Sequence, residues 1–281
     1  MGVVRFLKPA LGVCVVAFLL SVAAATPIPR LAQTEAPTAV DVELVLAVDV
    51  SYSMDPDEQA LQREGYRLAL TSKEFLNALR EGAHGKIAIT YVEWAGEFDQ
   101  KIVMPWRLID GPEAADAVSA EIGRAPYRRA SRTSISGGLR FARDLFGKGP
   151  YRGVRKVIDV SGDGTNNNGP PVAPMRDETI AAGIVINGLP IMLKRPNRGM
   201  LDIENLDVYY EDCVTGGPGS FVIPIREREQ FIEATREKLV QEIADRKTIP
   251  RVRPASAAAP RISCTIGEQM WRDRWGGYDF R

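Results

Sequence analysis

The sequence lacks an excess of charge of either sign, and it lacks a long apolar run after its first 25 residues. Lys plus Arg and Asp plus Glu number 36 each among the 281 residues, so no net field draws the protein to nucleic acid or to anionic lipid. No later segment reaches the roughly 20 apolar residues that span a bilayer. With 45% hydrophobic and 26% charged residues, the chain is typical of a globular protein with one main domain.

Residues 1–25 have the three parts of a secretory signal peptide, which are a basic start, an apolar stretch from Leu11 to Val22, and a run of alanines suited to cleavage. The apolar stretch is too short for a spanning helix. Cys14 lies in the middle of this stretch, where lipidation is not expected. We therefore expect a mature chain that begins near Thr26 and is periplasmic or secreted.

Cysteine and histidine are scarce in the mature chain, and their scarcity excludes two kinds of site. Once Cys14 has left with the signal, Cys213, Cys264 and His84 remain, too few for a cysteine–histidine zinc cluster. A Ser-His-Asp hydrolase would depend on His84, which sits in a turn-like stretch and is better explained as a solvated loop residue. In an oxidising compartment an even pair of cysteines favours a Cys213–Cys264 disulfide over two separate buried thiols.

Strands alternate with helices between residues 41 and 246. Residues 26–40, rich in Pro, Ala and Thr, indicate a flexible leader, and residues 247–281 indicate an irregular C-terminal extension. Between them, apolar runs predict strands at 42–48, 87–92, 101–104, 157–161, 184–189 and 221–225. Helical spacing predicts helices at 55–79, 112–122, 136–146, 175–182 and 227–244. This alternation predicts an α/β fold of three layers, doubly wound, with a mainly parallel sheet covered on both faces.

Oxygen-bearing side chains collect where two of these strands end. Asp49, Ser51 and Ser53 follow the first strand, and Asp163 follows the strand at 157–161. The carboxyl ends of parallel strands open onto one crevice, and Thr133, in a polar loop that begins a helix, can reach the same edge. Five hard oxygen donors suit Mg²⁺, Mn²⁺ or Ca²⁺ and suit zinc or copper poorly. The sequence therefore predicts a divalent metal site at this edge.

Three motifs in this order resemble a known superfamily. They are D-x-S-x-S at 49–53, R-T-S-I-S-G-G-L at 132–139 and V-S-G-D-G at 160–164. Together they resemble the metal-ion-dependent adhesion site (MIDAS) of von Willebrand factor A domains, over roughly residues 42–244. More narrowly, the chain resembles a bacterial secreted subgroup of this superfamily that has no assigned function. It departs from a plain A domain at residues 192–218, which are longer and more irregular than that domain needs.

The resemblance implies a role for each site residue. Ser51, Ser53 and Thr133 would contact the metal directly, while Asp49 and Asp163 would act largely through water. Neutral direct ligands leave the ion a strong Lewis acid, which favours a hard anionic oxygen from outside. We therefore expect non-catalytic recognition of an extracytoplasmic protein that presents an Asp or Glu to the metal. Arg132, beside Thr133, is expected to steer that acid.

Two other functions fit part of the sequence. The first is a magnesium-dependent aspartyl-phosphate hydrolase similar to haloacid dehalogenases, with Asp49 as nucleophile. Against it, Ser51 stands where most such phosphatases have their general acid, Asn167 stands where their magnesium loop has a second acid, and Thr133 has no role. The second is a structural envelope protein whose metal site is incidental.

Several other residues near the motifs have a structural explanation beside a functional one. The Gly137-Gly138 pair is expected to serve helix–strand packing. Residues 166–168, three asparagines, are expected to form a polar loop that can hydrogen-bond near the metal, and Trp94 to line the core or a cleft. The tail aromatics leave two alternatives open, packing on the domain or docking on a partner; they are Trp271, Trp275, Tyr278 and Phe280.

Overall fold

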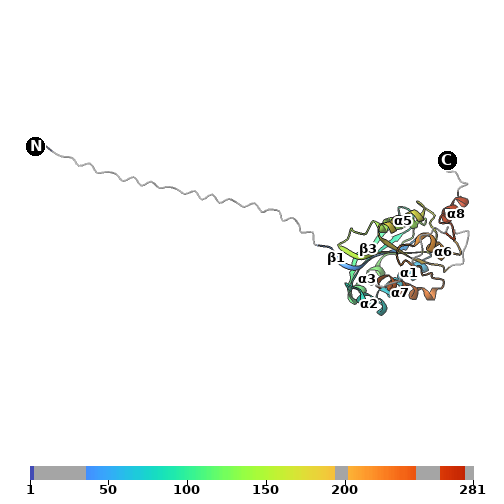
Figure 1. Ribbon diagram of the computed structural model, residues 1–281, viewed down its shortest axis with the longest axis horizontal. Helices are drawn as coiled ribbons and strands as arrows, with labels where there is room; N and C mark the ends of the chain where they lie inside the picture. Colours follow the sequence, from blue (N-terminus) through green and yellow to red (C-terminus); the bar gives the residue numbers. More distant parts are fainter. Residues whose placement is uncertain (3–35, 194–201, 245–259, 276–281) are drawn as a thin grey trace. The chain divides into compact units, whose positions relative to one another are not determined.

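The computed structural model describes residues 1–2, 36–193, 202–244 and 260–275 (Figure 1). The chain divides into an N-terminal unit, Met1–Glu35, and a compact unit, Ala36–Arg281, and the following account concerns the second. The expected signal peptide and most of the expected leader lie outside the described residues. Among the helices that the structure describes, none is long and apolar enough to cross a membrane.

A five-stranded sheet in the order β3-β2-β1-β4-β5 forms the middle layer. Its strands are β1 (Thr38–Asp49), β2 (Ile87–Trp94), β3 (Gln100–Ile109), β4 (Tyr151–Gly162) and β5 (Ile184–Pro190). Strand β1 runs parallel to β2 and β4, and β4 runs parallel to β5. Strand β3 is an antiparallel edge strand on β2. The carboxyl ends of β1 and β4 therefore lie side by side, as the sequence predicts.

Helices cover both faces of the sheet, as the apolar runs require of strands buried on two sides. One face carries α1 (Pro56–Leu70), α2 (Lys73–Glu81), α3 (Pro112–Arg124) and α7 (Phe231–Ile243). The other carries α4 (Ile135–Arg143), α5 (Val172–Ala181), α6 (Leu206–Tyr209) and a π-helical turn, Tyr210–Val214. Figure 1 shows the first group below the sheet and α5 above it. Alternate residues of β1 enter the two cores, which confirms the three-layer α/β fold.

The predicted helix at 55–79 is two helices. Asp55 caps α1 in a reciprocal box, in which its carboxylate accepts from Glu58 N at 2.8 Å and the Glu58 carboxylate accepts from Asp55 N at 2.9 Å. Ser72 then caps α2 by accepting from Phe75 N at 3.2 Å. A serine that competes for the backbone in this way ends one helix and begins the next. The presence of Ser72 within the helical pattern was the sequence signal that the helix is interrupted there.

Other expected boundaries also differ. The expected strand at 221–225 makes only isolated bridges, from Val222 to Gly188 and from Ile225 to Ile191. Strand β1 begins at Thr38, inside the expected leader. The expected irregular extension contains a ten-residue helix, α8 (Ile266–Trp275).

A cluster of buried charge lies between the sheet and helices α1 and α7. Lys238 Nζ pairs with Asp159 Oδ1 at 2.7 Å and with the Glu242 carboxylate, and all three side chains are fully buried or nearly so. Tyr66 also donates to Asp159 Oδ2 at 3.2 Å. The single ammonium group of Lys238 is therefore the ion-pair partner of two buried carboxylates. Burial, together with the charge of Asp159, raises the pKa of Glu242 from its ordinary 4.5 to about 7.

This raised pKa predicts a loss of stability as the pH rises. Between pH 4.5 and 7, folded Glu242 keeps a proton that the unfolded chain has released, so the free energy of unfolding falls as pH rises through this window. From pH 5 to pH 8 the wild type should lose roughly 1 to 3 kcal/mol more than Glu242→Gln, which cannot titrate. Urea unfolding at the two pH values measures the difference. Equal losses in both proteins would contradict it.

Candidate functional site

The segments that follow β1 and β4 meet through short hydrogen bonds. Ser51 Oγ and Ser53 Oγ lie 2.7 Å apart, and Ser53 Oγ donates to Asp163 Oδ1 at 2.6 Å. Ser51 N donates to Asp49 Oδ1 at 2.7 Å, which turns the chain sharply after the strand. Four of the five predicted ligands thus form one connected group at the sheet edge.

Thr133 joins this group from the loop before α4. Its backbone N donates to Asn167 Oδ1 at 3.0 Å, and Asn167 N donates to Thr133 O at 2.8 Å. A methyl group built on Gly164 would stand 3.8 Å from Thr133 Oγ1 and 4.0 Å from Ser53 Oγ. The two hydroxyls therefore border the same small space beside Gly164. The structure brings together all five predicted ligands.

Asp49 is fully buried, and its Oδ2 atom has no hydrogen-bond partner among the described residues. Burial and the neighbouring charge of Asp163 raise the pKa of Asp49 well above its usual range. Tyr210 Oη, also without a described hydrogen-bond partner, lies nearby, since a methyl on Gly162 would be 3.0 Å from it and 2.8 Å from Asp49 Oδ2. Buried carboxylates are normally paired or bound to cations. A cation beside Asp49 and Asp163 meets this requirement.

The donor set fits a hard divalent ion. Within the described part of the chain, no three His, Cys, Asp or Glu side chains gather as a metal-binding group, so a metal here depends on hydroxyl ligands. Three hydroxyls and two carboxylates are all hard oxygens, the kind that Mg²⁺, Mn²⁺ and Ca²⁺ take. Ser51, Ser53 and Thr133 would hold the ion, with Asp49 and Asp163 balancing its charge.

The three asparagines hold the site loops in place. Asn166 Oδ1 accepts from Ser136 N at 3.0 Å, which anchors the start of α4, and Asn168 Oδ1 accepts from Glu97 N at 2.8 Å. Their expected role as a polar hydrogen-bonding loop is confirmed. Gly138 packs as expected, because a Cβ there would stand 3.0 Å from the fully buried ring of Trp94. Trp94 is a core residue.

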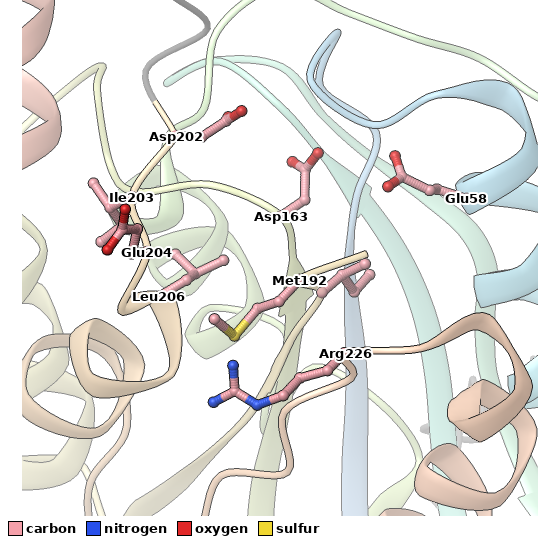
Figure 2. Close-up of a pocket in the computed structure, with 9 residues that line it drawn as sticks. Glu58, Asp163, Met192, Asp202, Ile203, Glu204, Leu206 and Arg226 are labelled. Carbon is pink, nitrogen blue, oxygen red and sulfur yellow. The ribbon is translucent and has the colours of Figure 1, made fainter. Parts of the chain in front are cut away.

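An acidic cavity opens on the Asp163 side of the site. Its volume is about 270 Å³, and its lining includes Glu58, Asp202 and Glu204. In Figure 2 the Asp163 carboxylate projects into this space between those of Asp202 and Glu58. Arg226 also lines it and pairs with Asp207 at 2.6 Å. This side of the site favours cations.

A second cavity, also about 270 Å³, is lined by the predicted hydroxyl ligands and by residues of opposite character. Besides Ser51, Ser53 and Thr133, its lining is aromatic, cationic or neutral polar: Tyr52, Ser131, Arg132, Asn167, Trp271, Arg274 and Trp275. Trp271, Arg274 and Trp275 belong to α8, and the sequence did not predict that this segment lies at the site. For the tail aromatics the sequence left two alternatives, packing on the domain or docking on a partner. Trp271 packs on the domain, because the centre of its ring lies 3.3 Å from the Arg132 guanidinium. Tyr278 and Phe280 lie outside the described residues.

A disulfide, a hydrogen bond and close packing hold α8 at this place. The expected Cys213–Cys264 disulfide is present and ties the start of the helix to the π-helical turn. Asn166 Nδ2 donates to Glu268 Oε1 at 2.8 Å. Gly267 lies so close to the asparagine loop that a Cβ would stand 2.1 Å from Asn166 O. A larger residue at position 267 cannot be accommodated without displacing the helix.

Comparison with solved structures places this fold among known ones. Proximal thread matrix protein 1 from the mussel byssus, solved with a zinc-occupied MIDAS motif, has a TM-score of 0.53 at 16% identity, covering 74% of this chain and 48% of that one. The pilus adhesin SpaC from Lactobacillus rhamnosus GG has a TM-score of 0.51 at 12% identity, covering 73% and 31%. This chain therefore spans less than half the length of either structure. At such identities the likeness concerns the fold alone.

The sheet order and its helical layers define a von Willebrand factor A-like fold. The chain belongs to the family described as protein of unknown function, DUF1194, whose model matches residues 39–247. No curated protein matches the sequence. Helix α8 lies beyond the matched segment.

Proposed function

We propose that this protein binds an acidic group of another protein, outside the cytoplasm, through a divalent metal ion held by Ser51, Ser53 and Thr133. The observation that carries the proposal is the buried Asp49 Oδ2, which has no described hydrogen-bond partner. Its other oxygen accepts from Ser51 N, next to the paired hydroxyls of Ser51 and Ser53. A dication there would be balanced by Asp49 and Asp163. The three neutral hydroxyls would leave it able to accept an anionic oxygen from a partner.

The metal is proposed to be magnesium, with manganese or calcium as substitutes, because every donor is a hard oxygen. Proximal thread matrix protein 1, which is similar in fold, was solved with zinc in its MIDAS motif. That observation supports divalent metal use on this fold. The proposed extracytoplasmic location is supported by the signal-like residues 1–25 and by the Cys213–Cys264 disulfide, which is characteristic of oxidising compartments.

Recognition is favoured over phosphate hydrolysis by the position of Asp49. An aspartyl nucleophile must reach its substrate, but Asp49 is fully buried and does not line either of the two cavities described above. The groups that line the second cavity beside the metal position are hydroxyls, which suit ligation. The arrangement can hold an ion and present it to a visiting carboxylate.

A labelled peptide with one acid, acetyl-Gln-Glu-Gln-Gln-amide, tests the proposed function. It should bind the mature protein in magnesium, lose binding in excess chelator, and lose binding when its Glu is replaced by Gln, because the metal recognises the carboxylate. Fluorescence anisotropy measures each case. Binding that is equal in chelator would contradict the proposal. Turnover of a generic phosphomonoester that disappears in Asp49→Asn would favour the hydrolase instead.

A further inference from the structure

The linings of the two cavities beside the site differ in charge, and this difference decides from which cavity an anionic ligand can approach the metal. The cavity on the Asp163 side has four carboxylates in its lining: Glu58, Asp163, Asp202 and Glu204. The cavity lined by Ser51, Ser53 and Thr133 has two guanidiniums and, among its described lining residues, no carboxylate. In the first cavity an approaching acid meets these four carboxylates and a single arginine, Arg226, which is already paired with Asp207; in the second it meets two arginines. That cavity is therefore the entry for an anionic ligand.

Two tryptophan rings in contact with each other lie between two arginine guanidiniums across this entry. The Arg132 guanidinium lies 3.3 Å from the centre of the Trp271 ring, Trp271 and Trp275 are 5.8 Å apart, and the Arg274 guanidinium is 5.5 Å from Trp275. Cation–π contacts of this kind fix the direction of a guanidinium without using up its hydrogen-bond donors. Tryptophan and arginine are also the residues that contribute most to binding at protein interfaces.

The backbone at Arg132 is also unusual. Among the described non-glycine residues, Arg132 alone has a positive φ, 76°. Such a conformation is strained and persists where the surroundings fix it, which is often at a functional site. The same residue, next to Thr133, has its guanidinium against the Trp271 ring. The loop and α8 are thus held to each other across the site.

We propose that α8 forms one wall of the ligand site and selects an acidic segment with more than one carboxylate, the first bound to the metal and a second bound to Arg274. This inference rests on the proposed function. The Trp271 and Trp275 rings would cover the backbone of the segment. Because α8 lies outside the matched residues 39–247, this wall adds to the A-like domain a specificity that its sheet edge does not contain.

The test compares the one-acid peptide with acetyl-Glu-Glu-Glu-Glu-amide, both in magnesium. In the wild type the four-acid peptide should bind about tenfold tighter or more, since hydrogen bonds to charged groups contribute roughly 1.5 to 3 kcal/mol. Arg274→Gln should reduce this preference to about fourfold, the statistical advantage of four acids over one, and leave the affinity for magnesium unchanged. Arg272→Gln is the matched control, because Arg272 is an exposed arginine on the same helix that does not line the cavity.

The outcomes separate this inference from the proposed function. Equal binding of the two peptides by the wild type, or an equal loss of preference in Arg272→Gln and Arg274→Gln, would overturn the role of α8 while the metal-dependent binding of one acid stands. Failure of both peptides to bind in magnesium would overturn the proposed function and, with it, the inference. Retention of the preference in Arg272→Gln and its loss in Arg274→Gln supports both.

Discussion

Replacing Thr133 by valine is expected to weaken magnesium binding at least about 100-fold and to change the free energy of unfolding in chelator by less than about 1 kcal/mol. The substitution removes one hydroxyl from the proposed coordination shell and keeps a branched side chain of similar shape. Changes to groups that only orient metal ligands already cost 10- to 100-fold in affinity, so loss of a direct ligand should cost at least as much. Isothermal titration of the chelator-treated protein measures the effect.

A matched control for this variant lies in helix α5. Thr179 is also buried, and its hydroxyl donates to Met175 O at 2.7 Å, within the helix and outside the site. Thr179→Val should bind magnesium as the wild type does. Similar magnesium affinity in Thr133→Val and the wild type would show that this hydroxyl is not a ligand. A large stability loss in chelator would mean that its role is in packing.

The second large effect is expected from removal of the disulfide. The double variant Cys213→Ala/Cys264→Ala opens a loop with a sequence separation of 51 residues. The bond limits the freedom of the unfolded chain, so the free energy of unfolding should fall by about 2 to 4 kcal/mol, as is typical of native disulfides. Denaturant unfolding of the variant beside the wild type, with and without reductant, measures this loss. The reduced wild type should match the variant.

The same variant also tests how α8 is held. Without the covalent bond, α8 still contacts the domain through Asn166–Glu268, Arg132–Trp271 and the packing of Ile266 and Gly267. We expect the preference for the four-acid peptide to decrease and the affinity for magnesium to persist, because none of the five predicted ligands is on the helix. An unchanged preference, with unfolding free energy equal to that of the wild type, would mean that the disulfide does not position α8.

The sheet and the site could be predicted from sequence because both depend on local patterns. Strands buried on two faces read as continuous apolar runs, as at residues 42–48, and parallel strands bring their carboxyl ends to one edge. The residues after β1 and β4 therefore had to be neighbours. The place of Thr133 could be predicted only from the motif at 132–139, because no local pattern determines which loop reaches the edge of the sheet. Its partner Asn167 was visible only as part of a polar run.

The C-terminal wall could not be predicted in the same way. Helix α8 has one buried residue, Gly267, so it lacks the apolar stripe by which an amphipathic helix is recognised. Its position depends on contacts with residues distant in sequence, above all Cys213 and Asn166. Tyr210 was expected to pack near Cys213, as it does, but its place beside Asp49 was not predicted, since the π-helical turn that brings it there has no sequence signature of its own.

The central claim is that the hydroxyls of Ser51, Ser53 and Thr133 bind one divalent ion. Anomalous scattering from crystals grown with manganese, for the wild type and Thr133→Val, tests it most directly. A single strong peak within coordination distance of all three hydroxyls in the wild type, weakened or absent in Thr133→Val, is the predicted result. A manganese peak elsewhere on the protein, or no peak beside these hydroxyls at manganese concentrations that saturate binding in solution, would contradict the claim.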